Sequence, residues 1–324
     1  MMPKAWPLVL GLAVATLTGC SANKPTSTSN SSAMTAEQLS VQTTLTAAPE
    51  VVTDGIFDAG TPTSFGSRPG VGNLSGVDGG GAPETDPNVP STERHWWRSI
   101  SDVARSIDYE FTAYDSDGRP RLAHIVVHKH FTGAFHVAWS DIVPSSTGTD
   151  SIVPHYLEKP LRDNWVRHLW LTRVAAAQHN GHEWMLVAAS GVNVTSEIED
   201  GGTQPQIQSI RVQAGGQDST FSDPAAAITW RKLWCAPPDA PVTVTVTTNA
   251  PDDAVFLMHQ DQRVMLTANG DNTYSGTWTT STFMGLKHFG VNALSHGTLF
   301  EGAAGYHSNA WLFPYLNRGE AYAG

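Results

Sequence analysis

Four histidines lie close together in the segment HIVVHKHFTGAFHVAW, namely His124, His128, His130 and His136. The first three share one parity of a predicted β-strand, so their side chains leave the same face of that strand. Imidazole is the commonest metal ligand among protein side chains, and several histidines on one face can converge on one metal ion such as zinc. This segment is therefore where the sequence supports a specific chemical hypothesis.

The apolar residues of the segment favour one hairpin register. A three-residue loop after Phe131 sets that side chain opposite Phe135 and keeps the apolar residues on one face. The same loop sets His130 opposite His136, because directly opposed residues share a face. His128 lies two residues from His130, about 6.6 Å along the strand. A two-residue turn would mix the faces, so we expect one cluster of these three histidines.

Such a cluster has two interpretations. Three imidazoles can bind zinc and leave a fourth position for water, as in a metal-assisted hydrolase that would use His128, His130 and His136. Alternatively, the histidines lie on a solvated face of an antiparallel sheet or line a pocket without any metal. No acidic residue follows closely in the sequence to orient the rings, so we favour the interpretation without a cofactor. We assign no catalytic residue, and the sequence lacks the nucleophile-elbow, H-E-x-x-H, phosphate-loop and C-x-x-C motifs.

The first twenty residues, MMPKAWPLVLGLAVATLTGC, combine one lysine, an apolar run and a cysteine preceded by small residues. The run is too short for a permanent transmembrane helix and is typical of a secretory signal. Its end, from Leu17 to Cys20, resembles the lipobox of bacterial lipoproteins. The resemblance implies cleavage after residue 19, lipidation of Cys20 and anchoring through acyl chains such as palmitate. Ser21 follows where aspartate would favour the inner membrane, so we expect the outer membrane or its periplasmic face.

Composition excludes some partners. The formal net charge of −11 argues against a nucleic acid as a partner.

The chain has two cysteines, so Cys235 has no disulfide partner if Cys20 is lipidated. The eleven tryptophans supply core residues and, where exposed, surfaces that can stack on sugar rings.

Composition and periodicity divide the chain into four parts. We expect a signal peptide in 1–19, a lipidated cysteine with a disordered Ser/Thr/Gly/Pro tether in 20–91, a β-rich domain in 92–235 and a second domain in 236–324. The tether is too poor in apolar residues to offset the entropy of ordering, although a short piece such as LSVQTTL can dock locally. The proline-rich APPDAP marks the boundary between the two folded domains.

The expected fold class is mainly β. A spacing of three and four residues predicts a short helix that carries Trp96, Trp97, Ile100 and Val103. Alternating strands follow around the turn at Asp115–Gly118 and around Asn180–Gly181. One or two helices with long antiparallel strands are similar to the cone of nuclear transport factor two-like proteins, so we expect a cone- or barrel-like α+β domain. The short strands after residue 240 resemble an immunoglobulin-like or fibronectin type III-like β-sandwich.

These observations favour a lipid-anchored cell-envelope protein that works by binding, with a polysaccharide, another envelope component or a protein as partner. The alternatives are the metal-assisted hydrolase and a structural spacer, since a tether followed by a sandwich is also what a spacer needs.

Replacing Cys20 by serine tests the anchor. The variant precursor is expected to remain without lipid and to leave the detergent phase in a detergent-partition assay, because the thioether needs the cysteine sulfur. Mass spectrometry of the wild-type N-terminus supplies the control. A mature N-terminus that carries no lipid, or that begins elsewhere than Cys20, would contradict this assignment.

Overall fold

The computed structural model describes residues 34–48, 63–65, 94–143, 145, 148, 151–175, 181–198, 201–259 and 262–318. The predicted signal peptide, Cys20 and most of the predicted tether lie outside these residues. The chain divides into two units, Met1–Thr35 and Ala36–Gly324, and the described helices and strands all belong to the second unit. Within the described ranges, no helix has both the length and the apolar character needed to cross a membrane.

The first nine elements of this unit are α1 (Ala36–Thr46), β1 (Thr63–Phe65), β2 (Arg94–Tyr114), β3 (Pro120–Val143), β4 (Ser151–Arg173), β5 (Trp184–Ser196), β6 (Ile207–Ala214), β7 (Gln217–Phe221) and β8 (Ile228–Thr229). After a 3-10 turn at Trp230–Lys232 come β9 (Cys235–Ala236), β10 (Pro241–Thr248), β11 (Ala254–His259), β12 (Gln262–Met265), β13 (Thr267–Ala268), β14 (Thr273–Thr279), β15 (Gly285–Leu294), α3 (His296–Phe300) and β16 (Ser308–Asn317).

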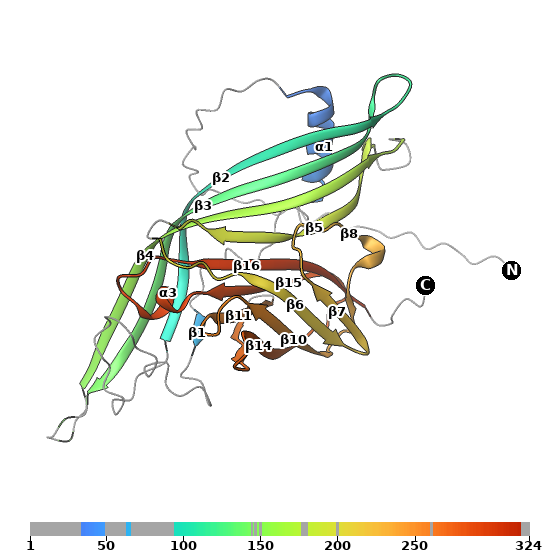
Figure 1. The fold of residues 1–324 in the computed structure, drawn as a ribbon. Coiled ribbons are helices and arrows are strands. Elements are labelled where there is room, and N and C mark those ends of the chain that lie inside the picture. Colours follow the sequence, from blue (N-terminus) through green and yellow to red (C-terminus); the bar gives the residue numbers. More distant parts are fainter. Residues whose placement is uncertain are drawn as a thin grey trace, which may run out of the picture. The chain divides into compact units, whose positions relative to one another are not determined.

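Two sheets contain these strands (Figure 1). The larger sheet has the order β1-β2-β3-β4-β5-β16-β15-β11-β12, with β8 added to β5 and β9 added to β16. The smaller sheet has the order β13-β14-β10-β6-β7. Every pair is antiparallel except β9 with β16. The prediction of a mainly β fold with antiparallel sheets and one or two helices is confirmed at the level of fold class, and neither sheet closes on itself among the described strands.

Strand pairing crosses the expected domain boundary at residue 236. In the larger sheet β16 pairs with β5, and in the smaller sheet β10 pairs with β6. Both sheets therefore draw strands from each side of the proline-rich segment, and this boundary does not separate two sheets. The expected tether also contains ordered pieces. The segment LSVQTTL lies in α1, where Val41 and Leu45 are buried in the core of the larger sheet, and β1 pairs with β2.

The helix expected around Trp96 is wrong, because these residues belong to β2. The strand carries a bulge, since Ile100 pairs with Gly133 and Asp102 pairs with Thr132. The extra residue, Ser101, shifts the side-chain parity by one. Trp96 therefore faces inward before the bulge, and odd-numbered residues face inward after it. The inward positions 96, 100 and 103 are four and three residues apart, which is also the spacing of one face of a helix.

The larger sheet curls so that strands far apart in its order meet inside. Trp96 of β2 packs against Phe135 of β3 and Phe256 of β11, with ring centroids 5.4 and 5.2 Å apart. The guanidinium of Arg263 on β12 lies 4.7 Å from the Trp96 ring, in a cation–π contact. β2 and β11 are six positions apart in the sheet order, so these contacts require the sheet to bend back on itself.

A buried polar network lies inside this curl. Arg98 of β2 donates to the Asn292 side chain of β15 at 2.6 Å and to the Tyr306 hydroxyl at 2.9 Å. The Tyr306 hydroxyl in turn donates to Asp163 of β4 at 3.0 Å. Arg98 Nε lies 3.8 Å from Asp163, and both side chains are completely buried. Burial raises the pKa of Asp163 to about 6, although Arg98 and Tyr306 oppose this increase.

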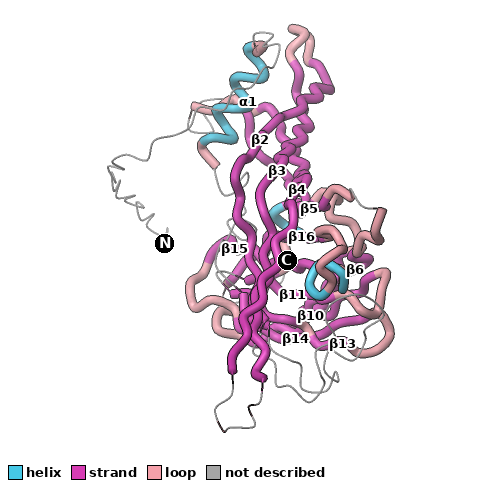
Figure 2. Tube along the Cα trace, turned by 90° about the vertical axis from the view of Figure 1, so that its left-hand side faces the viewer, coloured by secondary structure: helices cyan, strands magenta, loops and turns pink. Residues whose placement is uncertain are grey.

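The opposite face of the sheet is covered along β16, β15 and β11 by the smaller sheet. Alternate residues of β10, namely Val242, Val244 and Val246, are fully buried there with Trp311 and Phe313 of β16. This is sandwich-like packing of two sheets through their apolar faces. The covering sheet does not pair with β2, β3 or β4, which run side by side in Figures 1 and 2.

A fragment of residues 238–318 tests how far the two halves depend on each other. We expect it to remain unfolded by circular dichroism, because β16 would lose its partner β5 and β10 would lose its partner β6. A chain of residues 34–318 is the matched control and should unfold in one cooperative transition. An autonomous cooperative melt of the fragment would show that the shared strand pairs are dispensable.

Candidate functional site

The turn expected at 132–134 is wrong, because β3 continues through these residues. β2 pairs with one edge of β3 and β4 with the other, so Thr132 and Gly133 lie in the middle of a central strand. A glycine is needed at position 133 because the backbone of β2 approaches it closely, not because the chain turns there. A Cβ at this position would collide with the Ser99 carbonyl oxygen beside the bulge of β2.

The structure places His128, His130 and His136 on the same face of β3 but does not bring all three together. His130 and His136 are on one strand, six residues and about 20 Å apart, rather than opposite each other. Each imidazole has its own hydrogen-bond partner within 3.0 Å, which is Asp108 for His128, Asn164 for His130 and Ser99 for His136. Across the described ranges no group of three His, Cys, Asp or Glu side chains has an arrangement suited to a metal ion.

These histidines belong to a larger surface, the open face, which is the outer face of β2, β3 and β4. One row of directly paired residues crosses the larger sheet from β2 to β11 and shows why this face is open. The row consists of Ser106, His128, Val166, Asn193, Trp311, Val291 and Leu257. Paired residues share a face of a sheet. The last three members of the row are buried beneath the smaller sheet, whereas Ser106 is exposed and His128 and Val166 are partly exposed. One continuous face is thus covered at one end and open at the other.

A first aromatic cluster on the open face consists of Trp97, His136 and Tyr156. The Trp97 and His136 rings are stacked with centroids 4.9 Å apart, and Tyr156 lies 5.7 Å beyond His136. The Tyr156 hydroxyl bonds to His136 Nδ1, and it also donates to Glu158 at 3.1 Å. Tyr156 is 53% exposed, so this cluster presents a ring and two polar groups to solvent.

A second aromatic cluster consists of His124, His168 and Trp170. His124 stacks on Trp170 with centroids 5.1 Å apart and hydrogen-bonds to His168 at 3.1 Å. Its other ring nitrogen lies 3.3 Å from Glu110. The same arrangement of ring, imidazole and carboxylate therefore occurs twice on the open face.

Polar side chains connect the two aromatic clusters. His130 lies 3.6 Å from Glu197, and Asn164 donates to the same carboxylate at 3.2 Å. Beside β4 the surface sinks into a groove of about 480 Å³, whose walls include His168, Thr195 and Asp223. The open face is thus a band of rings and paired polar groups that ends in a groove against the smaller sheet.

The electrostatics of the second cluster favour the neutral form of His168. Burial lowers the pKa of His168, and the neighbouring His124 and His128 lower it further. Asp223 acts in the opposite direction. Neutral His168 retains one nitrogen that can accept a hydrogen bond from a ligand hydroxyl.

Sequence reasoning identified the histidines but did not connect them with Trp97, Tyr156 or Trp170. The available signal was parity, since all the open-face residues of β3 are even-numbered, as are those of β4. The partner strand of each residue was not visible in the sequence. Cys20, the predicted lipidation site, lies outside the described residues. Comparison of the chain with protein-family models, curated proteins and solved structures finds no match.

An NMR titration of the imidazole protons tests the second cluster. The His168 midpoint is expected below the ordinary value of 6.5, and His124→Gln should raise it because a neighbouring positive charge is removed. His155→Gln is the control and should leave the midpoint unchanged. Since the folded pKa is the lower one, the contribution of His168 to stability is complete above pH 6.5 and is lost as the pH falls toward the folded pKa. A midpoint at or above 6.5 would contradict the structure.

Proposed function

We propose that this protein is a lipid-anchored cell-envelope protein that binds an extended, uncharged polysaccharide on the open face. The observation that carries the proposal is the pair of aromatic clusters on the uncovered part of a sheet whose remaining outer face is buried. Rings that are clustered on an uncovered sheet face favour an interaction surface, because monomeric proteins rarely expose contiguous apolar patches without a function.

The chemistry of the face favours a sugar polymer. Tyr156 and Trp170 offer rings for the faces of sugar residues, and the carboxylates and imidazoles between them can bond to hydroxyl groups. The centres of protein–protein interfaces are depleted of charged residues. The open face has the opposite composition, with Asp108, Glu110 and Glu158 beside the rings.

Charge limits the kind of polymer. The chain carries a formal net charge of −11, and the carboxylates of the open face add a local negative field. An anionic polysaccharide would be repelled at neutral pH. An uncharged chain avoids this penalty and uses the same hydrogen-bonding groups.

Binding explains the face better than the two alternatives. A zinc hydrolase at His128, His130 and His136 would need converging imidazoles, whereas these three are bonded to separate partners. A spacer would have no use for two stacked aromatic clusters. In our proposal the lipobox cysteine anchors the protein at the outer membrane, and the sandwich, likened above to immunoglobulin-like modules, supports the open face.

Affinity electrophoresis through gels that contain a neutral glucan or, separately, alginate tests the proposal. The protein is expected to be retarded by the glucan and not by the anionic alginate. Tyr156→Ala and Trp170→Ala should each weaken binding about tenfold, the loss typical of a central aromatic residue in an interface. Phe283→Ala removes a ring that is 76% exposed outside the open face and is the matched control.

Equal retardation of all three variants would show that the open face is not the binding surface. Failure of several neutral glucans to retard the wild type would reject the polysaccharide itself.

A further inference from the structure

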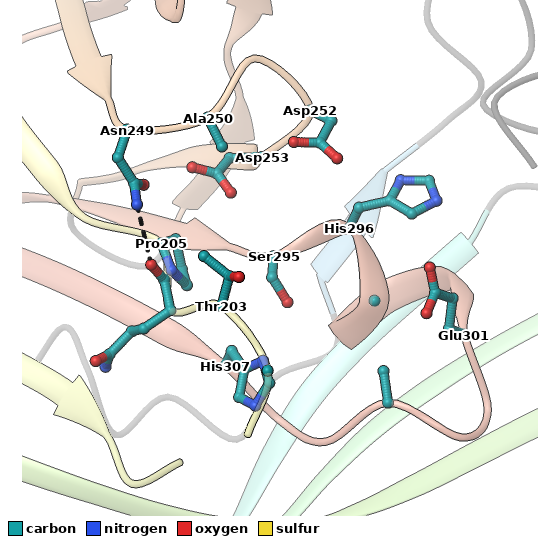
Figure 3. Close-up of a pocket in the computed structure, with 14 residues that line it drawn as sticks. Thr203, Pro205, Asn249, Ala250, Asp252, Asp253, Ser295, His296, Glu301 and His307 are labelled. Carbon is teal, nitrogen blue, oxygen red and sulfur yellow. Dashed lines mark hydrogen bonds between the residues drawn. The ribbon is translucent and has the colours of Figure 1, made fainter. Parts of the chain in front are cut away.

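A second cavity lies where three connections meet (Figure 3), and it shares Gln204 and Pro205 with the wall of the groove at the end of the open face. It encloses about 260 Å³ and is lined by the β5–β6 connection at 202–205, the β10–β11 turn at 249–253, the start of α3 and the segment 301–307. Asn249 holds two of these walls together, because its side chain donates to the Gln204 carbonyl at 3.2 Å and accepts from the Gln206 amide at 2.8 Å. The walls are therefore fixed by the fold.

Asp253 is the unusual residue of this cavity. Only 6% of the residue is exposed, and its Oδ2 atom is buried without a hydrogen-bond partner among the described residues. In Figure 3 its carboxylate points from the β10–β11 turn into the space above Thr203 and Ser295. A buried carboxylate oxygen without a partner is costly, so it marks a position where a hydrogen-bond donor is expected.

The remaining titratable groups around the cavity define its charge. Asp252 lies on the same turn, and His296, Glu301 and His307 come from α3 and the segment after it. Lys159 of β4 lies behind this wall, where its ammonium donates to the carbonyl oxygens of Gly297 and Glu301 at 2.6 and 2.7 Å. The part of the β5–β6 connection that lines the cavity, residues 202–205, has no titratable side chain. The cavity and its walls therefore have three carboxylates, two histidines and one lysine whose ammonium is already hydrogen-bonded to backbone carbonyls. This balance of charge favours a cation as the ligand.

We propose that this cavity binds the primary ammonium group of a small aliphatic amine, with Asp253 as its acceptor. The ammonium donates one hydrogen bond to Asp253 Oδ2. His296 also lines the cavity, but in Figure 3 its ring points away from Asp253, so Asp253 is the acceptor on which binding depends. The size of the cavity suits a molecule of a few heavy atoms rather than a polymer, which distinguishes this site from the open face.

Binding at this site depends on pH. Burial raises the pKa of Asp253 to about 7, and Asp252 raises it as well, whereas a hydrogen bond with Thr248 lowers it. The amine needs the ionised carboxylate, which accounts for roughly one tenth of the molecules at pH 6 and nine tenths at pH 8. Apparent affinity scales with the competent fraction, so binding should be about tenfold tighter at pH 8.

Calorimetry of the intact protein with putrescine at pH 6 and pH 8 tests the proposal, with 1,4-butanediol as the uncharged analogue. We expect putrescine to bind about tenfold more tightly at pH 8 and butanediol not to bind at either pH. Asp253→Asn should abolish binding, and Asp271→Asn, at an exposed turn, should leave it unchanged.

The change in putrescine affinity between pH 6 and pH 8 is measured on the wild-type protein, so this test does not depend on whether a variant folds. Equal binding of putrescine and butanediol, binding that does not change between pH 6 and pH 8, or a response to calcium chloride alone would each overturn the proposal. None of these results concerns glucan binding, so the two sites are tested separately.

Discussion

The buried guanidinium of Arg98 is the interaction on which the curled sheet depends. It joins β2 to Asp163 of β4, to Asn292 of β15 and to Tyr306 before β16. Bringing two charges out of water costs several kcal/mol each, and good geometry with further hydrogen bonds is needed to offset that cost. Removing one partner would leave a buried charge uncompensated, at a cost of about 3–5 kcal/mol. The network therefore penalises any arrangement in which these strands separate.

The curl determines which surface remains available. Its inner face carries the packed rings of Trp96, Phe135 and Phe256, which belong to the core of the larger sheet. Its outer face is shared between the smaller sheet and solvent. β10 covers the part formed by strands from the C-terminal half, whereas β2, β3 and β4 continue past the cover. The open face thus exists because the smaller sheet covers only some strands of the larger sheet and leaves the long strands β2, β3 and β4 uncovered.

Carboxylates have two different environments in this molecule. On the open face Asp108 and Glu110 are exposed beside histidines, where water screens them and exchange with ligand hydroxyls costs little. In the second cavity Asp253 is almost fully buried, and its pKa lies near neutrality. The first environment suits many weak contacts with an extended polymer. The second suits one strong, pH-dependent contact with a small cation.

Local patterns in the sequence determined the strand-rich class, the side-chain parity of β3 and the turn at Asp115–Gly118, where the Asp115 amide bonds to the Arg119 carbonyl. These features depend on residues within a few positions of each other, so the alternation and the turn residues suffice to predict them. The lipobox is likewise a local motif, and lipidation of Cys20 stays a prediction.

Only the tertiary structure decided that β16 pairs with β5 and that β2 contains a bulge at Ser101. It also decided that Asp253 and His296 line one cavity. The pairing of β16 with β5 joins residues more than a hundred positions apart, and local periodicity contains no information about such a partner. The bulge changed the parity of β2 and made Gly133 a site of close backbone approach, which the sequence presented as a turn. The histidines were placed on the correct face of their strand but with the wrong neighbours, because β3 continues through residues 132–134 and pairs with β2 and β4 instead of folding back on itself.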